Sequence, residues 1–235
     1  MGQLRFTAAD ARVARATAVY ILLLTLFPLM LSEPVFRYTF SEEGPYEQLS
    51  IAGWVLAALL ILVRIRPLGL KAWTFASIFV MFAAREADLH KAFTVGSIFK
   101  SRYYLDAAAP IRDKLVSGIV AAGMIALVVY AGFVIMRFLF RQGGLQSRTG
   151  FWLMLGTASF VLCKVVDRAP AILAEGYGIT LPPLAMRYAS AFEEGMELLN
   201  PLLFMWSIWI SQTEKSPLFL PGAAKGDIEN AGEVA

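Results

Sequence analysis

The residues best suited to chemistry are carboxylates near the start of the last long apolar segment. Glu193, Glu194 and Glu197 fall within two helical turns, and an apolar run begins soon after them at Leu202. An acidic or basic side chain at the centre of a membrane helix costs about 2.5 to 3.5 kcal/mol on insertion scales. Such groups persist where they face the protein interior or a wet cavity. The rest of the chain is therefore expected to supply their partners.

A second acidic segment repeats the same spacing. Glu86 and His90 are four residues apart, as are Glu193 and Glu197, so each pair projects from one face of its helix. An imidazole together with carboxylates suits Zn, Fe or Mn. The sequence predicts that these four residues, with Glu47 as a further ligand, form a site for a divalent metal ion or a proton.

The leading functional hypothesis is a metal-dependent membrane hydrolase or transferase that acts on a lipid or lipid-linked substrate. The metal would polarise a phosphoryl or acyl oxygen and lower the pKa of a bound water. A carboxylate outside the ligand set, Glu194 or Asp88, is the candidate general base. Lys164, Arg168 and Arg102 are the candidates for holding an anionic headgroup.

Three alternatives use the same residues. The acids can form a structural cluster neutralised by basic residues such as Arg85 and Lys164, because buried charges are normally paired. They can also serve as proton or cation sites of a transporter, whose helices are usually broken near the midplane, and Pro201 is the candidate break. Finally, the chain can be a non-catalytic assembly subunit, alone or within a homo- or hetero-oligomer.

The composition indicates an integral membrane protein. Of 235 residues, 58% are hydrophobic and only 17% are charged, with a mean hydropathy of +0.62. The pI near 9.0 does not indicate nucleic acid as a partner, because the basic residues flank apolar runs. A single cysteine, Cys163, excludes an intrachain disulfide, and a single histidine excludes a multi-histidine metal site. Membrane lipid is the expected partner.

The apolar runs predict an all-α membrane bundle of about six transmembrane helices, since about 20 apolar residues span a bilayer. Residues 1–212 form one domain, with an outer interfacial loop at about 91–114, and residues 213–235 form a disordered cytoplasmic tail. The predicted spans are roughly 14–32, 47–65, 69–90, 115–140, 149–172 and 184–212.

The charges also predict an orientation with both termini in the cytoplasm. The short turns on the predicted inner side carry basic residues and no acid, whereas the carboxylates gather on the other side. In this arrangement the acids of the second, third, fifth and sixth spans all lie at one membrane face. Antiparallel packing is then expected to bring them together near the outer interface.

Three short strings carry a resemblance. Residues 84–91 read Ala-Arg-Glu-Ala-Asp-Leu-His-Lys, residues 97–104 read Ser-Ile-Phe-Lys-Ser-Arg-Tyr-Tyr, and residues 43–47 read Glu-Gly-Pro-Tyr-Glu. Together they resemble patterns in uncharacterised bacterial multi-pass inner-membrane proteins. The resemblance implies a location in the bacterial inner membrane and brings no activity with it.

Overall fold

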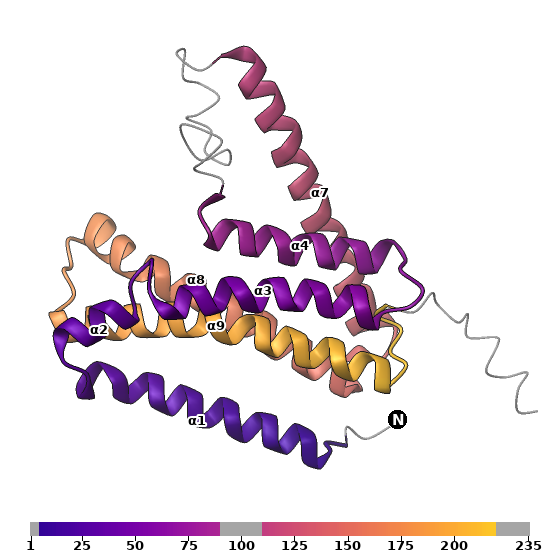
Figure 1. The fold of residues 1–235 in the computed structure, drawn as a ribbon, viewed down its shortest axis with the longest axis horizontal. Coiled ribbons are helices and arrows are strands. Elements are labelled where there is room, and N and C mark those ends of the chain that lie inside the picture. The colour runs from indigo at the N-terminus through magenta and orange to yellow at the C-terminus, as the bar shows by residue number, and fades with distance from the viewer. Residues whose placement is uncertain (1–4, 90–109, 220–235) are drawn as a thin grey trace, which may run out of the picture.

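The computed structural model describes residues 5–89 and 110–219, and in these ranges every regular element is helical. The described residues contain seven α-helices and one 3-10 turn, which follow one another in the order shown in Figure 1. Their bounds are α1 Ala8–Met30, α2 Glu33–Thr39, α3 Pro45–Arg64, α4 Leu70–Glu86, α7 Ile111–Arg141, η1 Gly144–Gln146, α8 Arg148–Tyr177 and α9 Pro183–Thr213.

Six long helices occupy the six predicted segments. Four of them, α1, α3, α7 and α8, are long and apolar enough to cross a membrane. The other two are α4, which has 17 residues, and α9, whose first half carries the glutamates. The prediction of an all-α fold is confirmed for the described residues, and the four apolar helices support the prediction of a membrane protein, whereas the six crossings and the orientation stay predictions.

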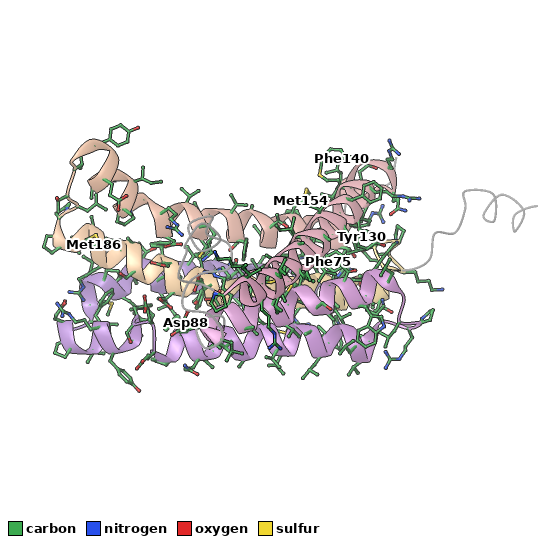
Figure 2. The ribbon with its side chains drawn as sticks, turned by 90° about the horizontal axis from the view of Figure 1, so that it is seen from above. Phe75, Asp88, Tyr130, Phe140, Met154 and Met186 are labelled. Atoms are coloured by element: carbon green, nitrogen blue, oxygen red, sulfur yellow. The ribbon has the colours of Figure 1, made fainter. Side chains whose placement is uncertain are left out.

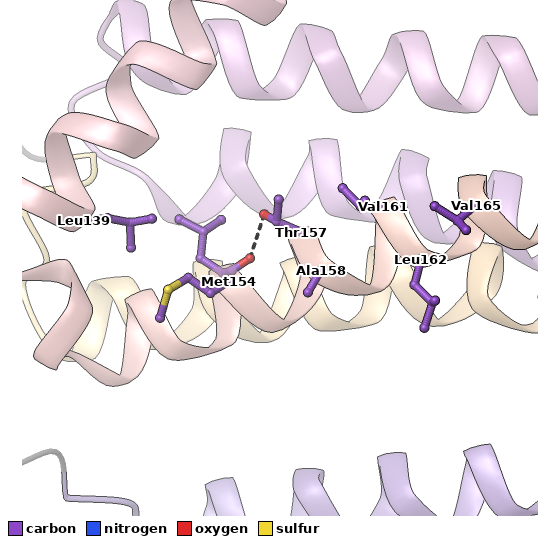
Figure 3. Close-up of a pocket in the computed structure, with 8 residues that line it drawn as sticks. Leu139, Met154, Thr157, Ala158, Val161, Leu162 and Val165 are labelled. Carbon is purple, nitrogen blue, oxygen red and sulfur yellow. Dashed lines mark hydrogen bonds between the residues drawn. The ribbon is translucent and has the colours of Figure 1, made fainter.

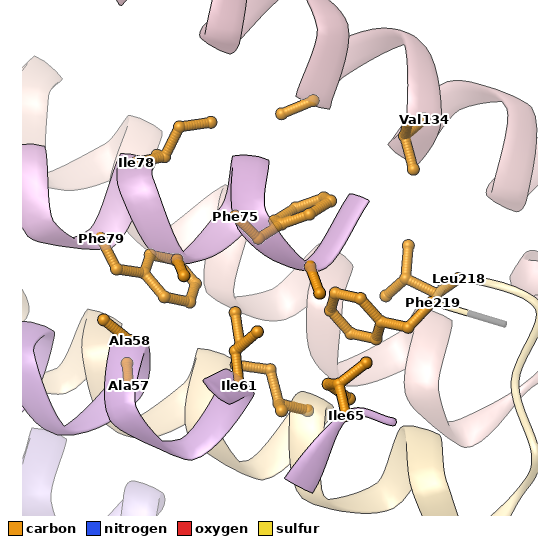
Figure 4. Close-up of a cluster of buried hydrophobic side chains, with 14 of the residues drawn as sticks. Ala57, Ala58, Ile61, Ile65, Phe75, Ile78, Phe79, Val134, Leu218 and Phe219 are labelled. Atoms are coloured by element: carbon orange, nitrogen blue, oxygen red, sulfur yellow. The ribbon is translucent and has the colours of Figure 1, made fainter. Parts of the chain in front are cut away.

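Helix α9 is the element on which the bundle is built. It packs against α8, α3 and α1, while α4 lies against α3 (Figure 1). The main apolar core fills the space between α3 and α4 and reaches α7 (Figure 4). Its fully buried members include Ala57 and Ile61 of α3, and Phe75 and Phe79 of α4 are almost fully buried. These residues recur at helical spacing, which is why one face of each helix is buried.

Helix α7 runs obliquely over the other helices and carries Tyr130 and Phe140 (Figure 2). Its buried residues lie mainly in its second half, where Val134 and Phe138 enter the core. Near its start, Ile119 is 73% exposed. Much of α7 therefore presents apolar side chains outward, as expected for a helix that faces lipid.

Asp10, which is 1% exposed, links the start of α1 at Thr7 to the start of α8 at Arg148. Its carboxylate accepts hydrogen bonds from Arg148 Nε at 2.7 Å, Trp152 Nε1 at 3.1 Å and Trp206 Nε1 at 3.3 Å. It also accepts from the backbone N–H of Thr7, in a capping box at the start of α1. One acid thus joins α1, α8 and α9.

The chain beyond α9 returns to the bundle. Glu214 accepts hydrogen bonds from the backbone N–H groups of Arg148 at 3.2 Å and Thr149 at 2.9 Å, and so caps α8. Leu218 and Phe219 are buried in the main core. The segment predicted as a tail from residue 213 therefore begins with residues that pack into the fold, and residues 220–235 lie outside the described part.

Candidate functional site

Acidic side chains that are far apart in the sequence lie at the same height along the helix bundle, as predicted. Glu47 lies in the first turn of α3, Glu86 ends α4, and Glu197 lies about four turns into α9. Because α3 and α9 run antiparallel to α4 and α8, residues from helix starts and helix ends reach the same level (Figure 1). Lys164 of α8 joins them there through its ion pair with Glu197.

Glu197 is at the centre of the polar contacts. Its Oε1 accepts a hydrogen bond from Lys164 Nζ at 2.6 Å and lies 3.5 Å from an Arg85 guanidinium nitrogen. The Glu86 Oε1 lies 3.4 Å from the same guanidinium group, so one arginine holds both carboxylates side by side. Two carboxylates held this close repel each other unless a proton or a cation offsets part of their charge.

A second carboxyl pair lies on the other side of Lys164. Asp167 of α8 and Glu193 of α9 lie close enough for their charges to interact. Lys164 Nζ lies 3.9 Å from Asp167 Oδ2, and Arg168 Nε lies 3.9 Å from the same oxygen. Ion pairs therefore connect Glu86 through Arg85, Glu197 and Lys164 to Asp167.

The last acid of the site is Glu194 of α9. Its side chain is about nine-tenths buried, and its Oε2 is without a hydrogen-bond partner among the described residues. The charges that act on it most strongly are other acids, Glu197, Glu193, Glu47 and Glu86. Buried polar atoms are almost always partnered, so this oxygen is the most unusual polar atom of the described site.

We name the acid cluster as the six carboxylates that interact at this level. Of the described residues, the cations in contact with it are Arg85, Lys164 and Arg168. The described part of the site thus has twice as many acids as bases. The members of the acid cluster are Glu47, Glu86, Asp167, Glu193, Glu194 and Glu197.

A neutral pair continues the polar face of α9. Ser159 of α8 donates a hydrogen bond at 2.7 Å to the side-chain oxygen of Asn200, which is 1% exposed. Cys163 is fully buried, and its Sγ lies 3.5 Å from the Glu193 carbonyl oxygen. These contacts fix the register between α8 and α9.

An aromatic layer lies directly beneath the acid cluster, toward the end of the bundle that holds Thr7. The helices that supply the polar residues each place a ring one or two turns deeper. Ring centroids are 4.8 Å apart for Trp54 and Phe82, and 5.0 Å apart for Phe82 and Phe160. Trp54 is 1% exposed, so the layer seals one side of the cluster. We define the aromatic layer as Trp54, Phe79, Phe82, Phe160 and Phe204.

The remaining predicted site residues are placed differently. Asp88 is exposed in the turn after α4, where its φ of 50° is one that aspartate tolerates (Figure 2). Arg168 has a side chain that is 75% exposed. His90 and Arg102 lie outside the described residues. Within residues 5–89 and 110–219, no group of three His, Cys, Asp or Glu side chains is placed to hold one metal ion.

Sequence reasoning identified the acids and overlooked the neutral residues that position them. Ser50 and Trp54 of α3 lie beside the acids, yet neither residue type marks a polar site in the sequence. The available signal was Pro201, because a proline inside a helix leaves a carbonyl that needs another donor. That carbonyl belongs to Glu197, four residues earlier.

Comparisons of the chain with protein-family models, with curated proteins and with solved structures found no match.

Proposed function

We propose that the acid cluster binds protons and that the protein is a proton- or cation-coupled membrane transporter. The observation that carries the proposal is that the Glu86 and Glu197 carboxylates both lie within 3.5 Å of one Arg85 guanidinium group, so two acids from different helices are held side by side. Ionisable groups that interact within a membrane commonly mark proton or ion pathways.

The charge balance supports the same proposal. Two like charges held a few ångströms apart in a low-dielectric environment repel strongly, so neighbouring carboxylates are stabilised by sharing protons. Lys164 and Arg85 offset part of the negative charge through Glu197. The buried Oε2 of Glu194 has no hydrogen-bond donor among the described residues, and protonation of this carboxyl group would remove its buried charge.

The surroundings of the cluster suit alternating access. The aromatic layer closes the cluster on one side, as expected of a state open to the other side only. Pro201 lies inside the continuous helix α9, between Glu197 and Phe204, and removes one backbone hydrogen bond at the boundary of the polar and aromatic layers. A helix weakened beside the binding site suits a transporter, because secondary transporters commonly bend or unwind their helices there.

Proton binding is tested first because it requires no knowledge of the cargo. Infrared spectra of the protein in liposomes, recorded across a pH titration, should show a protonated-carboxyl band that Glu86→Gln and Glu197→Gln each reduce. Glu175→Gln, which changes an exposed acid of α8, is the matched control. An unchanged band in the Glu86→Gln/Glu197→Gln double variant would overturn the proposal.

Proton movement is tested second. Liposomes with an internal pH-sensitive dye and an imposed pH gradient should acidify faster with the natural protein than with Glu197→Gln. If the infrared band responds but wild-type and variant liposomes acidify equally at every cation composition tried, the transporter proposal fails while proton binding stands. If the variants only lose thermal stability, the cluster is structural.

A metal-assisted enzyme acting on a lipid is the second candidate, and the unpartnered Glu194 oxygen favours it. The described donors do not supply three ligands for one ion, so they do not fit a metal centre on their own. Metal analysis of gently purified protein decides the matter. Less than roughly a tenth of an equivalent of Zn, Fe or Mn would reject this candidate.

We also infer six crossings of the bacterial inner membrane, with both termini in the cytoplasm. The six long helices alternate in direction, and the basic residues at the turns follow the positive-inside rule. Single cysteines introduced at Ser41 and at Gln142, in a Cys163→Ala background, test the orientation. A membrane-impermeant thiol reagent should label position 41 and not position 142 in intact cells, and the reverse result would invert the topology.

A further inference from the structure

Helix α8 forms one wall of an apolar groove beside α7 (Figure 3). The groove has a volume of about 480 Å³, and Leu139 of α7 lies at one end of it. Its one hydroxyl, on Thr157, donates a hydrogen bond to the Leu153 carbonyl at 2.8 Å and so presents no free donor. The wall from α8 includes Met154, Ala158, Val161 and Val165.

Arg168 follows Val165, the last groove residue along α8, by about one helical turn. Val161, Val165 and Arg168 are spaced four and three residues apart, so they form one stripe along α8. The Arg168 side chain is 75% exposed, and its contact with Asp167 is long, at 3.9 Å. An arginine at this distance from its partner retains most of its donors for another anion.

We propose that the groove binds one acyl chain of an anionic phospholipid whose phosphate is held by Arg168. The guanidinium group matches phosphate oxygens in geometry and charge. From Leu153 to Val165 the groove runs for about 18 Å at 1.5 Å per residue. One leaflet of the hydrocarbon core is about 15 Å thick, so a chain of one leaflet fits along it.

This site is distinct from the acid cluster and does not depend on its function. The acid cluster is enclosed among α3, α4, α8 and α9, whereas the groove faces outward between α7 and α8. Asp167 connects the two sites, since its carboxylate lies 3.9 Å from both Arg168 and Lys164. The bound phosphate would therefore lie next to the cluster without entering it.

Native mass spectrometry tests the proposal on the full chain released from nanodiscs of phosphatidylglycerol or phosphatidylcholine. The natural protein should retain phosphatidylglycerol preferentially, and Arg168→Gln should lower that preference about tenfold, as expected for loss of a charge-assisted hydrogen bond. Arg12→Gln, at an exposed position of α1, is the matched control. Ala158→Trp, which fills the groove, should reduce retention of both lipids.

Several outcomes would overturn the proposal. Equal lipid preference in Arg168→Gln and natural protein would remove the headgroup contact, and this exposed change does not threaten folding. Displacement of the lipid by glycerol phosphate alone would show a headgroup site without a role for the groove. If light scattering finds a dimer that Ala158→Trp dissociates, a second copy of the chain covers the groove instead.

Discussion

The Ser50 hydroxyl group donates a hydrogen bond at 3.0 Å to the backbone carbonyl of Glu197. In an uninterrupted helix that carbonyl would accept from the N–H of residue 201, but residue 201 is a proline and has no N–H. Gly53, one turn further along α3, contacts the Pro201 ring. Helix α3 thus supplies both the donor that the proline removes and the space that its ring needs.

Ser50→Ala should lower stability because it leaves a buried carbonyl without a donor. The expected loss in the free energy of unfolding is about 1 to 3 kcal/mol. In a Pro201→Ala background the residue-201 N–H can serve Glu197, so the same change should cost much less. Thermal and denaturant unfolding in detergent measures the cycle, with the exposed Ser41→Ala as control. Equal losses in both backgrounds would contradict the pairing.

Gly53→Ala should strain the contact between α3 and α9. A Cβ atom at this position would lie 2.8 Å from the Pro201 Cγ, which is closer than side chains pack. Overpacking of this kind typically costs about 1 to 3 kcal/mol. Gly132→Ala on α7, where a Cβ atom meets open space, is the control. If the Gly53 variant melts at the wild-type temperature, the helices are less tightly fitted than described.

The sequence was sufficient for the helices and for the layer of acids, but not for their pairing. Length and hydropathy locate the long helices, and antiparallel connections put Glu86 and Glu197 at one level. Whether two side chains at one level meet depends on the rotation of each helix about its axis, which periodicity leaves open within tens of degrees. The contacts of Lys164 with Glu197 and of Arg85 with both acids are decided by that rotation.

Other features depended on contacts distant in sequence. In the sequence, Asp10 has the position of an ordinary helix-capping acid. Its contacts with two indole groups and Arg148 become visible only in the structure. The segment after Thr213 lacks hydrophobic periodicity, yet Leu218 and Phe219 fill the core next to Phe75. Single apolar residues in a polar segment give no signal of such packing.

Asp10→Ala should destabilise the joint between α1, α8 and α9. Arg148, whose side chain is 17% exposed, would lose its 2.7 Å partner. Removing one member of a largely buried ion pair typically costs about 3 to 5 kcal/mol. Tryptophan fluorescence should also change, because Trp152 and Trp206 lose their acceptor. Asp10→Asn keeps one acceptor oxygen, so its stability should lie between those of the wild type and Asp10→Ala. An Asp10→Ala variant as stable as the wild type would refute this role.

Lys164→Met should show whether the ion pair with Glu197 holds α8 to α9. The substitution leaves Glu197, which is 7% exposed, without its 2.6 Å partner, and Arg85 at 3.5 Å compensates only in part. Lys164 is 28% exposed, so solvent screening reduces the expected loss below the 3 to 5 kcal/mol typical of fully buried pairs, to about 2 kcal/mol. Glu197→Gln added to Lys164→Met removes the unpaired charge and should restore part of the melting temperature. Lys215→Met, beyond the end of α9, is the control, and a double variant less stable than Lys164→Met would show that the two residues do not act as a pair.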